Sequence, residues 1–217
     1  MARGTSFGGL HSSTDFHLIQ QSVDVQPAQP KLNLVDVPGA DGSKDLSAQP
    51  AGRIVYQDRT LTWTFGLYPG ENWHAKHREV SNALNGRACD ITLDDDPGYY
   101  YQGRLSVEKY NVDGLLKQIV VKAICRPYKF KQEETVVSSS LTTAYKDIDL
   151  PNDRKPVVPV ITVSANTTLQ WDGNTFTLNA GTHKVLDIEL KEGGNTLAAK
   201  VASGTGSITV TYQEGAL

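Results

Sequence analysis

The segment Val35-Asp-Val-Pro-Gly-Ala-Asp-Gly-Ser-Lys-Asp-Leu46 is a strand-like run that leads into a tightly specified turn. Pro38 fixes its own φ and has no N–H to donate, whereas Gly39 and Gly42 permit positive φ. Asp41 can hydrogen-bond its own backbone two residues on. We therefore predict a structural turn at Pro38, Gly39, Asp41 and Gly42, and we expect its role to be positional.

Apolar and polar residues alternate in several stretches on both sides of this turn, which is typical of half-buried antiparallel strands. We expect strands over His17 to Val25, Lys31 to Val37, Arg53 to Gln57 and Thr60 to Leu67. The residues Tyr56-Gln-Asp-Arg-Thr60 predict a short hairpin turn between the last two.

One segment follows a helical period instead. Between Asn72 and Asn85, the residues Trp73, His77, Val80 and Leu84 are spaced by four, three and four, which places them on one helical face. Gly86 follows where a left-handed residue would end the helix. The sequence therefore predicts one substantial helix at about 72–85.

The remainder of the first half again predicts strands. They are expected over Arg87 to Leu93, Tyr99 to Tyr110 and Leu115 to Cys125, with turns at Asp94 to Gly98 and at Asp113-Gly114. Arg126-Pro127 ends the last strand, because proline cannot donate to a central ladder.

The composition changes after a charged stretch, so we expect two domains: residues 1–130, a linker at 131–134, and residues 135–217. The second domain is rich in Thr, Val, Asn and Gly, and its short strands predict a small β-sandwich. Those strands are Val157 to Ser164, Thr167 to Trp171, Asn174 to Leu178, His183 to Leu190, Thr196 to Ala202 and Ser207 to Gln213. Asp172-Gly173 predicts a two-residue hairpin.

Charge and hydropathy limit the classes of function. The 217 residues carry a net charge of −3, which gives no general reason to bind nucleic acid. No apolar run approaches the ~20 residues of a membrane span, and none resembles a signal peptide, so we expect folding in a cytoplasm. Cys89 and Cys125 lack metal-ligand spacing, and free thiols are expected in a reducing compartment.

Few residues suggest catalysis or metal binding. Asp94, Asp95 and Asp96 invite a metal, but consecutive residues point apart and a solvated turn is the favoured interpretation. His74 and His77 lack the HExxH spacing and a third ligand. We therefore predict no catalytic residues, metal or cofactor, and no enzyme.

Several ordered segments resemble the distal tail protein (Dit) family of siphophages. They are Val37 to Ser43, Val80 to Gly86, Leu93 to Arg104, Gly193 to Leu197 and Ile208 to Leu217. The resemblance covers nearly the whole chain. It implies a mainly β fold, in which an N-terminal β-domain with one helix precedes a galectin-like (carbohydrate-binding-module-like) sandwich.

The resemblance also implies a function and partners. Such a protein is a structural virion component of the tail tip, or baseplate, made in the host cytoplasm and assembled as a hexameric ring. The ring would join the major tail tube protein to the tail-associated hub or lysin protein, with the tape-measure protein in its lumen. Neither membrane insertion nor sequence-specific nucleic-acid binding is expected.

Two other classes of function remain open from the sequence. The sandwich could be a glycan-binding module for host recognition, in which Trp171 stacks on a sugar ring, although strand aromatics are more often core residues. A hydrolase acting on cell-wall material would depend on Asp95.

Overall fold

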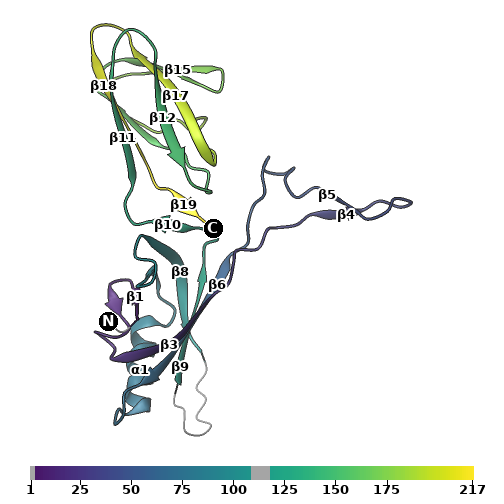
Figure 1. Ribbon diagram of the computed structural model, residues 1–217, viewed down its shortest axis with the longest axis vertical. Coiled ribbons are helices and arrows are strands. Elements are labelled where there is room, and N and C mark those ends of the chain that lie inside the picture. The colour runs from purple at the N-terminus through teal and green to yellow at the C-terminus, as the bar shows by residue number, and fades with distance from the viewer. Residues whose placement is uncertain (1–2, 109–117) are drawn as a thin grey trace. The chain divides into compact units, whose positions relative to one another are not determined.

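The computed structural model describes residues 3–108 and 118–217. The chain divides into two compact units, Met1–Lys129 and Phe130–Leu217, each of which has its own buried apolar cluster (Figure 1). The fold is mainly β, and its sheets are antiparallel. The turn expected at Asp113-Gly114 lies outside the described residues.

Seven strands form the main sheet of the N-terminal unit, in the order β2-β1-β7-β8-β9-β6-β3. Their bounds are β1 Thr5–Phe7, β2 Leu10–His11, β3 Leu18–Val25, β6 Arg59–Leu67, β7 Ala88–Leu93, β8 Tyr99–Val107 and β9 Gln118–Cys125. Their alternation is that of a sheet with one buried face: in β6, Leu61, Trp63 and Phe65 are fully buried, and the threonines between them are not.

The sheet curls around its own core. Phe7 of β1 contacts Trp63 of β6 edge-on, with ring centroids 5.0 Å apart, although β7, β8 and β9 separate the two strands in the sheet. A flat sheet would hold these rings several strand spacings of about 4.8 Å apart. The buried side chains therefore lie inside a strongly curved surface.

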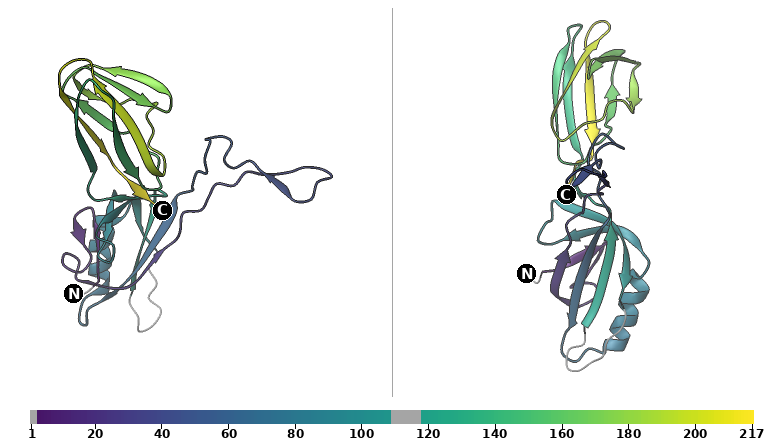
Figure 2. Two further views of the ribbon diagram at one scale, coloured as in Figure 1. Left: turned by 45° about the horizontal axis from the view of Figure 1, so that its top comes forward. Right: turned by 90° about the vertical axis from the view of Figure 1, so that its right-hand side faces the viewer.

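Helix α1 spans Trp73–Leu84 and confirms the predicted helix. The Asn72 side chain accepts a hydrogen bond from the Ala75 N–H at 3.1 Å, and Gly86 adopts φ 79° after the last turn. Trp73, Val80 and Leu84 are buried, so the face found from the spacing is the face that packs (Figure 2).

The expected hairpin between Arg53–Gln57 and Thr60–Leu67 is wrong. Residues 53–57 form no strand; instead Tyr56 pairs with Pro30 in a single bridge, and the Lys31 N–H donates to the Val55 carbonyl at 2.8 Å. The chain then enters β6 directly. Of the expected strand Lys31 to Val37, only β4 (Leu34–Asp36) is formed, and it pairs with β5 (Ser43–Asp45).

The C-terminal unit contains two four-stranded antiparallel sheets with orders β11-β18-β13-β16 and β12-β17-β14-β15. Their bounds are β11 Thr135–Leu141, β12 Lys146–Asn152, β13 Val160–Val163, β14 Thr167–Trp171, β15 Asn174–Leu178, β16 Gly181–His183, β17 Gly193–Val201 and β18 Gly206–Tyr212. The buried cluster draws on both sheets. The predicted Asp172-Gly173 hairpin is confirmed, with φ 48° and 79°.

Three features of this unit differ from the expectation. β11 and β12 were not foreseen. The strand expected over His183 to Leu190 is wrong, because β16 (Gly181–His183) ends where that strand was expected to begin and Leu190 forms only an isolated bridge with Val157. Lys131, placed in the linker, ends β10 (Lys129–Lys131), which pairs with β19 (Gly215–Ala216).

Candidate functional site

The most conspicuous candidate site is an exposed arm, which we define as residues 26–58 between β3 and β6 (Figure 1). Every residue from 31 to 45 is exposed. Its centre is the β4–β5 hairpin, which has its own two-stranded sheet separate from the main one. A single two-stranded hairpin is marginally stable in water, so the arm relies on its base and on local hydrogen bonds.

The turn of the arm is the one that the sequence predicted. Gly39 and Gly42 have φ 82° and 72°, and the Ala40 N–H donates to the Val37 carbonyl at 3.1 Å. Beside it, the Ser43 hydroxyl donates to the Asp36 carboxylate at 2.5 Å. The turn therefore has a specified shape at a fully exposed tip.

The flanks of the hairpin are also held by polar contacts. The Asn33 N–H donates to the Ser47 hydroxyl, and the Ser47 N–H to the Asp45 carboxylate, both at 2.8 Å. Hydrogen bonds to the Asp45 carboxylate from the Ser47 side chain and backbone lower the pKa of Asp45. Local hydrogen bonds of this kind order a loop that has no core of its own.

At the base, Arg59 anchors the arm to the sheet. Its side chain is buried, and its Nε donates to the Gln26 carbonyl at 3.0 Å while the guanidinium lies 5.5 Å from the centre of the Tyr101 ring. The Gln26 N–H in turn donates to the Thr60 carbonyl at 3.0 Å. The arm therefore leaves the sheet from a fixed point.

The arm exposes four aliphatic side chains: Leu32, Leu34, Val35 and Val37 have 61%, 55%, 41% and 45% of their surface accessible. Aliphatic residues at successive exposed positions on a projecting segment are typical of an interaction surface. These side chains can bind the surface of another protein through shape complementarity and apolar contact.

We expect Gly42→Val to loosen the tip of the arm without unfolding the molecule. No atom lies within 4 Å of a Cβ at Gly42, so the cost comes from the positive φ alone, about 1–2 kcal/mol. Hydrogen exchange of residues 34–46 should speed up several-fold while the melting temperature stays unchanged. Ala40→Val is the matched control, because Ala40 has no positive φ; equal exchange in both variants would contradict the assignment.

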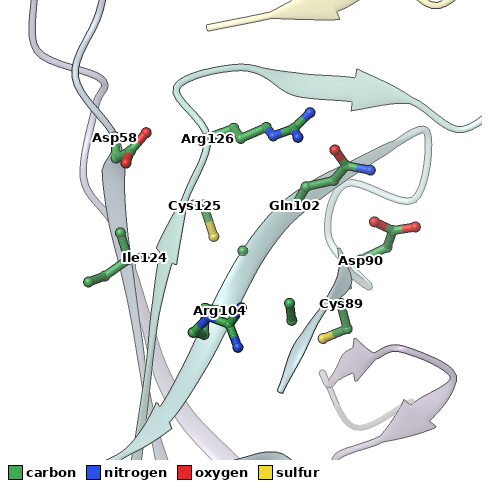
Figure 3. A pocket seen from close by; sticks show the side chains of 10 residues that line it. Asp58, Cys89, Asp90, Gln102, Arg104, Ile124, Cys125 and Arg126 are labelled. Carbon is green, nitrogen blue, oxygen red and sulfur yellow. The ribbon is translucent and has the colours of Figure 1, made fainter. Parts of the chain in front are cut away.

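A second surface lies on β7, β8 and β9, where a shallow hollow combines both charge signs (Figure 3). Asp90 and Gln102 lie beside Arg104 and Arg126, and Ile124 has 59% of its surface exposed. This surface is suited to a protein partner, since it offers polar and aliphatic groups on an open sheet face.

Both cysteines are free thiols that flank Gly103 of β8. Cys89 of β7 and Cys125 of β9 are each in register with Gly103, which places their Cα atoms two strand spacings, about 9.5 Å, apart. A disulfide requires Cα atoms within ~7 Å. A Cβ at Gly103 would lie 2.8 Å from the Ile124 carbonyl, so glycine is needed there.

We expect the two thiols to differ in reactivity. Burial raises the pKa of Cys89, and it raises the pKa of Cys125 to about 12, although Arg59 opposes that shift. Cys125 has 1% of its surface exposed. In the folded protein at neutral pH, Ellman's reagent should therefore label Cys89 slowly and Cys125 only after unfolding. Rapid reaction of both thiols, or an internal disulfide on a non-reducing gel, would contradict this.

The three consecutive aspartates have different partners. Asp94 accepts the Gly4 N–H at 2.8 Å, Asp95 pairs with Arg3 at 3.2 Å, and Asp96 pairs with Lys129 at 2.7 Å. They therefore diverge around the predicted turn instead of meeting at one ion.

The structure does bring together a Ser, His and Asp that the sequence did not suggest. Ser13 Oγ lies 3.1 Å from His11 Nδ1, and His11 Nε2 lies 3.3 Å from the Asp94 carboxylate. The N–H groups of Ser13 and Thr14 also point at Nδ1, at 3.3 and 3.4 Å. Because these N–H groups are engaged with the imidazole, they are not oriented toward a substrate oxyanion. We interpret the cluster as a set of hydrogen bonds that stabilises the N-terminal turn.

The other predicted residues lie in structural positions. His74 is exposed, and His77 is stacked on Trp73 with ring centroids 4.8 Å apart. Trp171 belongs to the buried cluster of the C-terminal unit and has 8% of its surface exposed. Its ring therefore offers little area on which a sugar could stack. The described residues contain no helix with the length and apolar character that crossing a membrane requires.

Comparison with known proteins shows a likeness to a solved structure. No protein-family model matches the chain, and no curated protein matches it. Among solved structures, it is similar to the Dit (gp 19.1) protein of SPP1, described as a paradigm of the hub adsorption apparatus in phages that infect Gram-positive bacteria. The two share 17% identity with a TM-score of 0.66, and the match covers 98% of this chain and 99% of the other. The resemblance to distal tail proteins is therefore confirmed at the level of the fold, which this chain shares with SPP1 Dit from end to end.

Proposed function

We propose that the chain is a structural protein of a phage tail tip that assembles as a hexameric ring. The ring joins the tail tube to the tail-associated hub protein, and the tape-measure protein passes through its lumen. The protein has no catalytic role in this function. The end-to-end likeness of fold to a hub protein supports the proposal, because the match includes both units and not one common domain.

The exposed arm is the structural feature that supports ring assembly. It exposes aliphatic side chains on a segment that has no core of its own. A ring with rotational symmetry needs a heterologous interface, in which one patch meets a different patch on the neighbour. A projecting hairpin with a fixed base provides one half of such an interface, and the neighbour's sheet surface provides the other.

Native mass spectrometry and negative-stain electron microscopy of the purified full chain test this function. Rings of six copies with a central opening, either single or joined in pairs, are expected at micromolar concentration. A chain that remains monomeric at high concentration and is absent from purified tails would refute the proposal.

Glycan binding through the C-terminal unit, the alternative kept open by the sequence, gains no support from a specific observation. It depended on Trp171, whose ring is buried. A glycan array of the full chain beside Trp171→Ala remains the direct test, and we expect no signal above background for either.

A further inference from the structure

The sheet β11-β18-β13-β16 differs from the rest of the chain in its lack of charge. Its four strands contain no Asp, Glu, Lys or Arg, whereas charged residues make up 21% of the sequence. On its outer face, Ser138 lies 3.0 Å from Thr209, and Thr162 lies 3.0 Å from Thr182, hydroxyl to hydroxyl. Hydroxyl groups that already bond to one another can be removed from water at low cost.

One edge of this sheet is a long strand that contains no protecting residue of its own. β11 is seven residues long, is paired only with β18 among the described residues, and keeps a regular register from Thr135 to Leu141. Proteins guard edge strands with lysine, proline, bulges or short length, because a bare edge accepts another strand. β11 has no Lys, Pro or bulge, and Val136 has 58% of its surface exposed.

The other edges of the unit are guarded. The strand β16 is only three residues long. Residues of β15 line a polar hollow together with Asp172 and Asp187, whose carboxylates therefore lie beside that edge. The edge strand of the second sheet, β12, carries three charged residues and a proline. Its guarding residues are Lys146, Asp147, Asp149 and Pro151. The strand β11 itself carries none of these residues, and the charged group that reaches its edge is the Lys146 ammonium of β12, at the Ser140 carbonyl.

The geometry of β11 fixes which backbone groups face outward. Lys146 Nζ donates to the Ser140 carbonyl at 3.3 Å, so this carbonyl points away from β18. Backbone groups alternate along an edge strand, so those of Ser138 and Val136 face the same way. The first residue, Thr135, is held by a hydrogen bond from its hydroxyl to Glu214, which orders the strand before any partner arrives.

We propose that the open edge of β11 pairs antiparallel with β11 of a second copy, which joins two C-terminal sandwiches through one continuous sheet. A two-fold axis at Ser138 sets Val136 opposite Ser140 of the partner subunit, and no charged residue of either strand lies in the contact. Because each copy has one such edge, the pairing closes at two copies and does not propagate. In a ring, the edges of all copies would act together and strengthen the joining of two rings.

Ser138→Pro tests the proposal, because proline removes an outward N–H and blocks an incoming strand while leaving the bonds to β18 intact. It also removes the hydroxyl pair with Thr209, so Thr209→Val, which loses that pair without touching the edge, is the matched control. Val136→Lys places a charge at the edge of β11 and provides a second test of the pairing if the proline variant does not fold.

We expect native mass spectrometry to give wild type and Thr209→Val twice the particle mass of Ser138→Pro and Val136→Lys. Equal masses for all four proteins would overturn the pairing. The same comparison in the arm variant Leu32→Ser, Leu34→Ser separates β11 pairing from ring assembly. In that variant β11 pairing alone gives a dimer, and adding Ser138→Pro converts the dimer to a monomer. A monomer in the arm variant with intact β11 would also overturn it.

Discussion

Changing Leu32 and Leu34 together to serine is expected to abolish ring assembly while leaving the fold intact. Both side chains are more than half exposed and belong to neither buried cluster. Surface changes of this kind shift the free energy of unfolding by no more than about 0.5 kcal/mol. Full burial of an exposed leucine side chain contributes about 1.5–3 kcal/mol, and only a little over half of each of these side chains remains to be buried, so the two leucines account for about 2–3.5 kcal/mol per contact.

An effect of that size weakens each contact between subunits by roughly 20- to 300-fold, because 1.4 kcal/mol corresponds to a factor of ten. Native mass spectrometry should therefore show the loss of particles built from six-copy rings under conditions where the wild type assembles. Leu186→Ser is the matched control, since Leu186 has 75% of its surface exposed but lies outside the arm. Rings of normal mass from the double variant would contradict the role of the arm.

Limited trypsin digestion gives an independent measure of the same contact. Lys31, Lys44 and Arg53 all lie in the arm and are exposed in the single chain. Assembly should protect these sites, so cleavage in the arm should be slow in the wild type and fast in the double variant. Equally fast cleavage in assembled wild type would place the arm outside the interface.

The arm also shows where sequence patterns stop being informative. Pro38, Gly39 and Gly42 specify a turn through local geometry, and the structure contains it. The alternation over Lys31 to Val37 correctly indicated a segment with an apolar side, but the pattern does not say what covers that side. A half-buried strand was expected, whereas the segment is exposed in the single chain. If the cover is a neighbouring subunit, no pattern within one chain could identify it.

β11 was missed for a different reason. Its sequence, Thr-Val-Val-Ser-Ser-Ser-Leu141, places serines on both faces, so the alternation that marked β6 is weak. The row Cys89–Gly103–Cys125 and the cluster of Ser13, His11 and Asp94 depend on strand register between distant segments. Helix α1 was found because its signals are local: an N-cap, a spaced apolar face and a glycine after the end.

Glu214→Gln is expected to destabilise the C-terminal unit by about 2–3 kcal/mol, the range for lost hydrogen bonds to a buried charge. Glu214 has 4% of its surface exposed, and its carboxylate receives three donors. Lys131 Nζ at 2.7 Å and the Thr135 hydroxyl donate to Oε1, and the Asp153 N–H donates to Oε2 at 3.0 Å. In glutamine one oxygen becomes an NH2 group, which would face one of these donors, so at least one bond is lost.

Lys131 is the first residue of the stretch that the sequence suggested was a linker, and Thr135 directly follows that stretch. Both ends of that stretch are therefore bound to Glu214, next to the C-terminus. The carboxylate fixes the entry into β11 as well as the β10–β19 pair, since the Lys131 N–H also donates to the Glu214 carbonyl at 3.1 Å. Loss of the charge should loosen these strands first, which hydrogen exchange of residues 129–137 would detect.

The pH dependence gives the sharpest test. Burial alone raises the pKa of Glu214, but hydrogen bonds from Lys131 and Thr135, with the Lys131 charge and the Asp153 N–H, outweigh it and hold the pKa below its ordinary value. A lowered folded-state pKa means that the stabilisation is complete above the unfolded-state value of about 4.3 and is lost as the pH falls through the folded-state value. Wild type should therefore lose this stability in acid, and Glu214→Gln should not.

Urea unfolding of both proteins between pH 7 and pH 3, followed through the C-terminal transition, measures the difference. The gap of about 2–3 kcal/mol at pH 7 should narrow as the pH falls below about 4. Glu192→Gln is the matched control: its carboxylate pairs with Arg154 at 2.6 Å but is 57% exposed, and an exposed pair contributes at most about 1 kcal/mol. A gap that stays constant with pH would mean that Glu214 acts through packing and not through its charge.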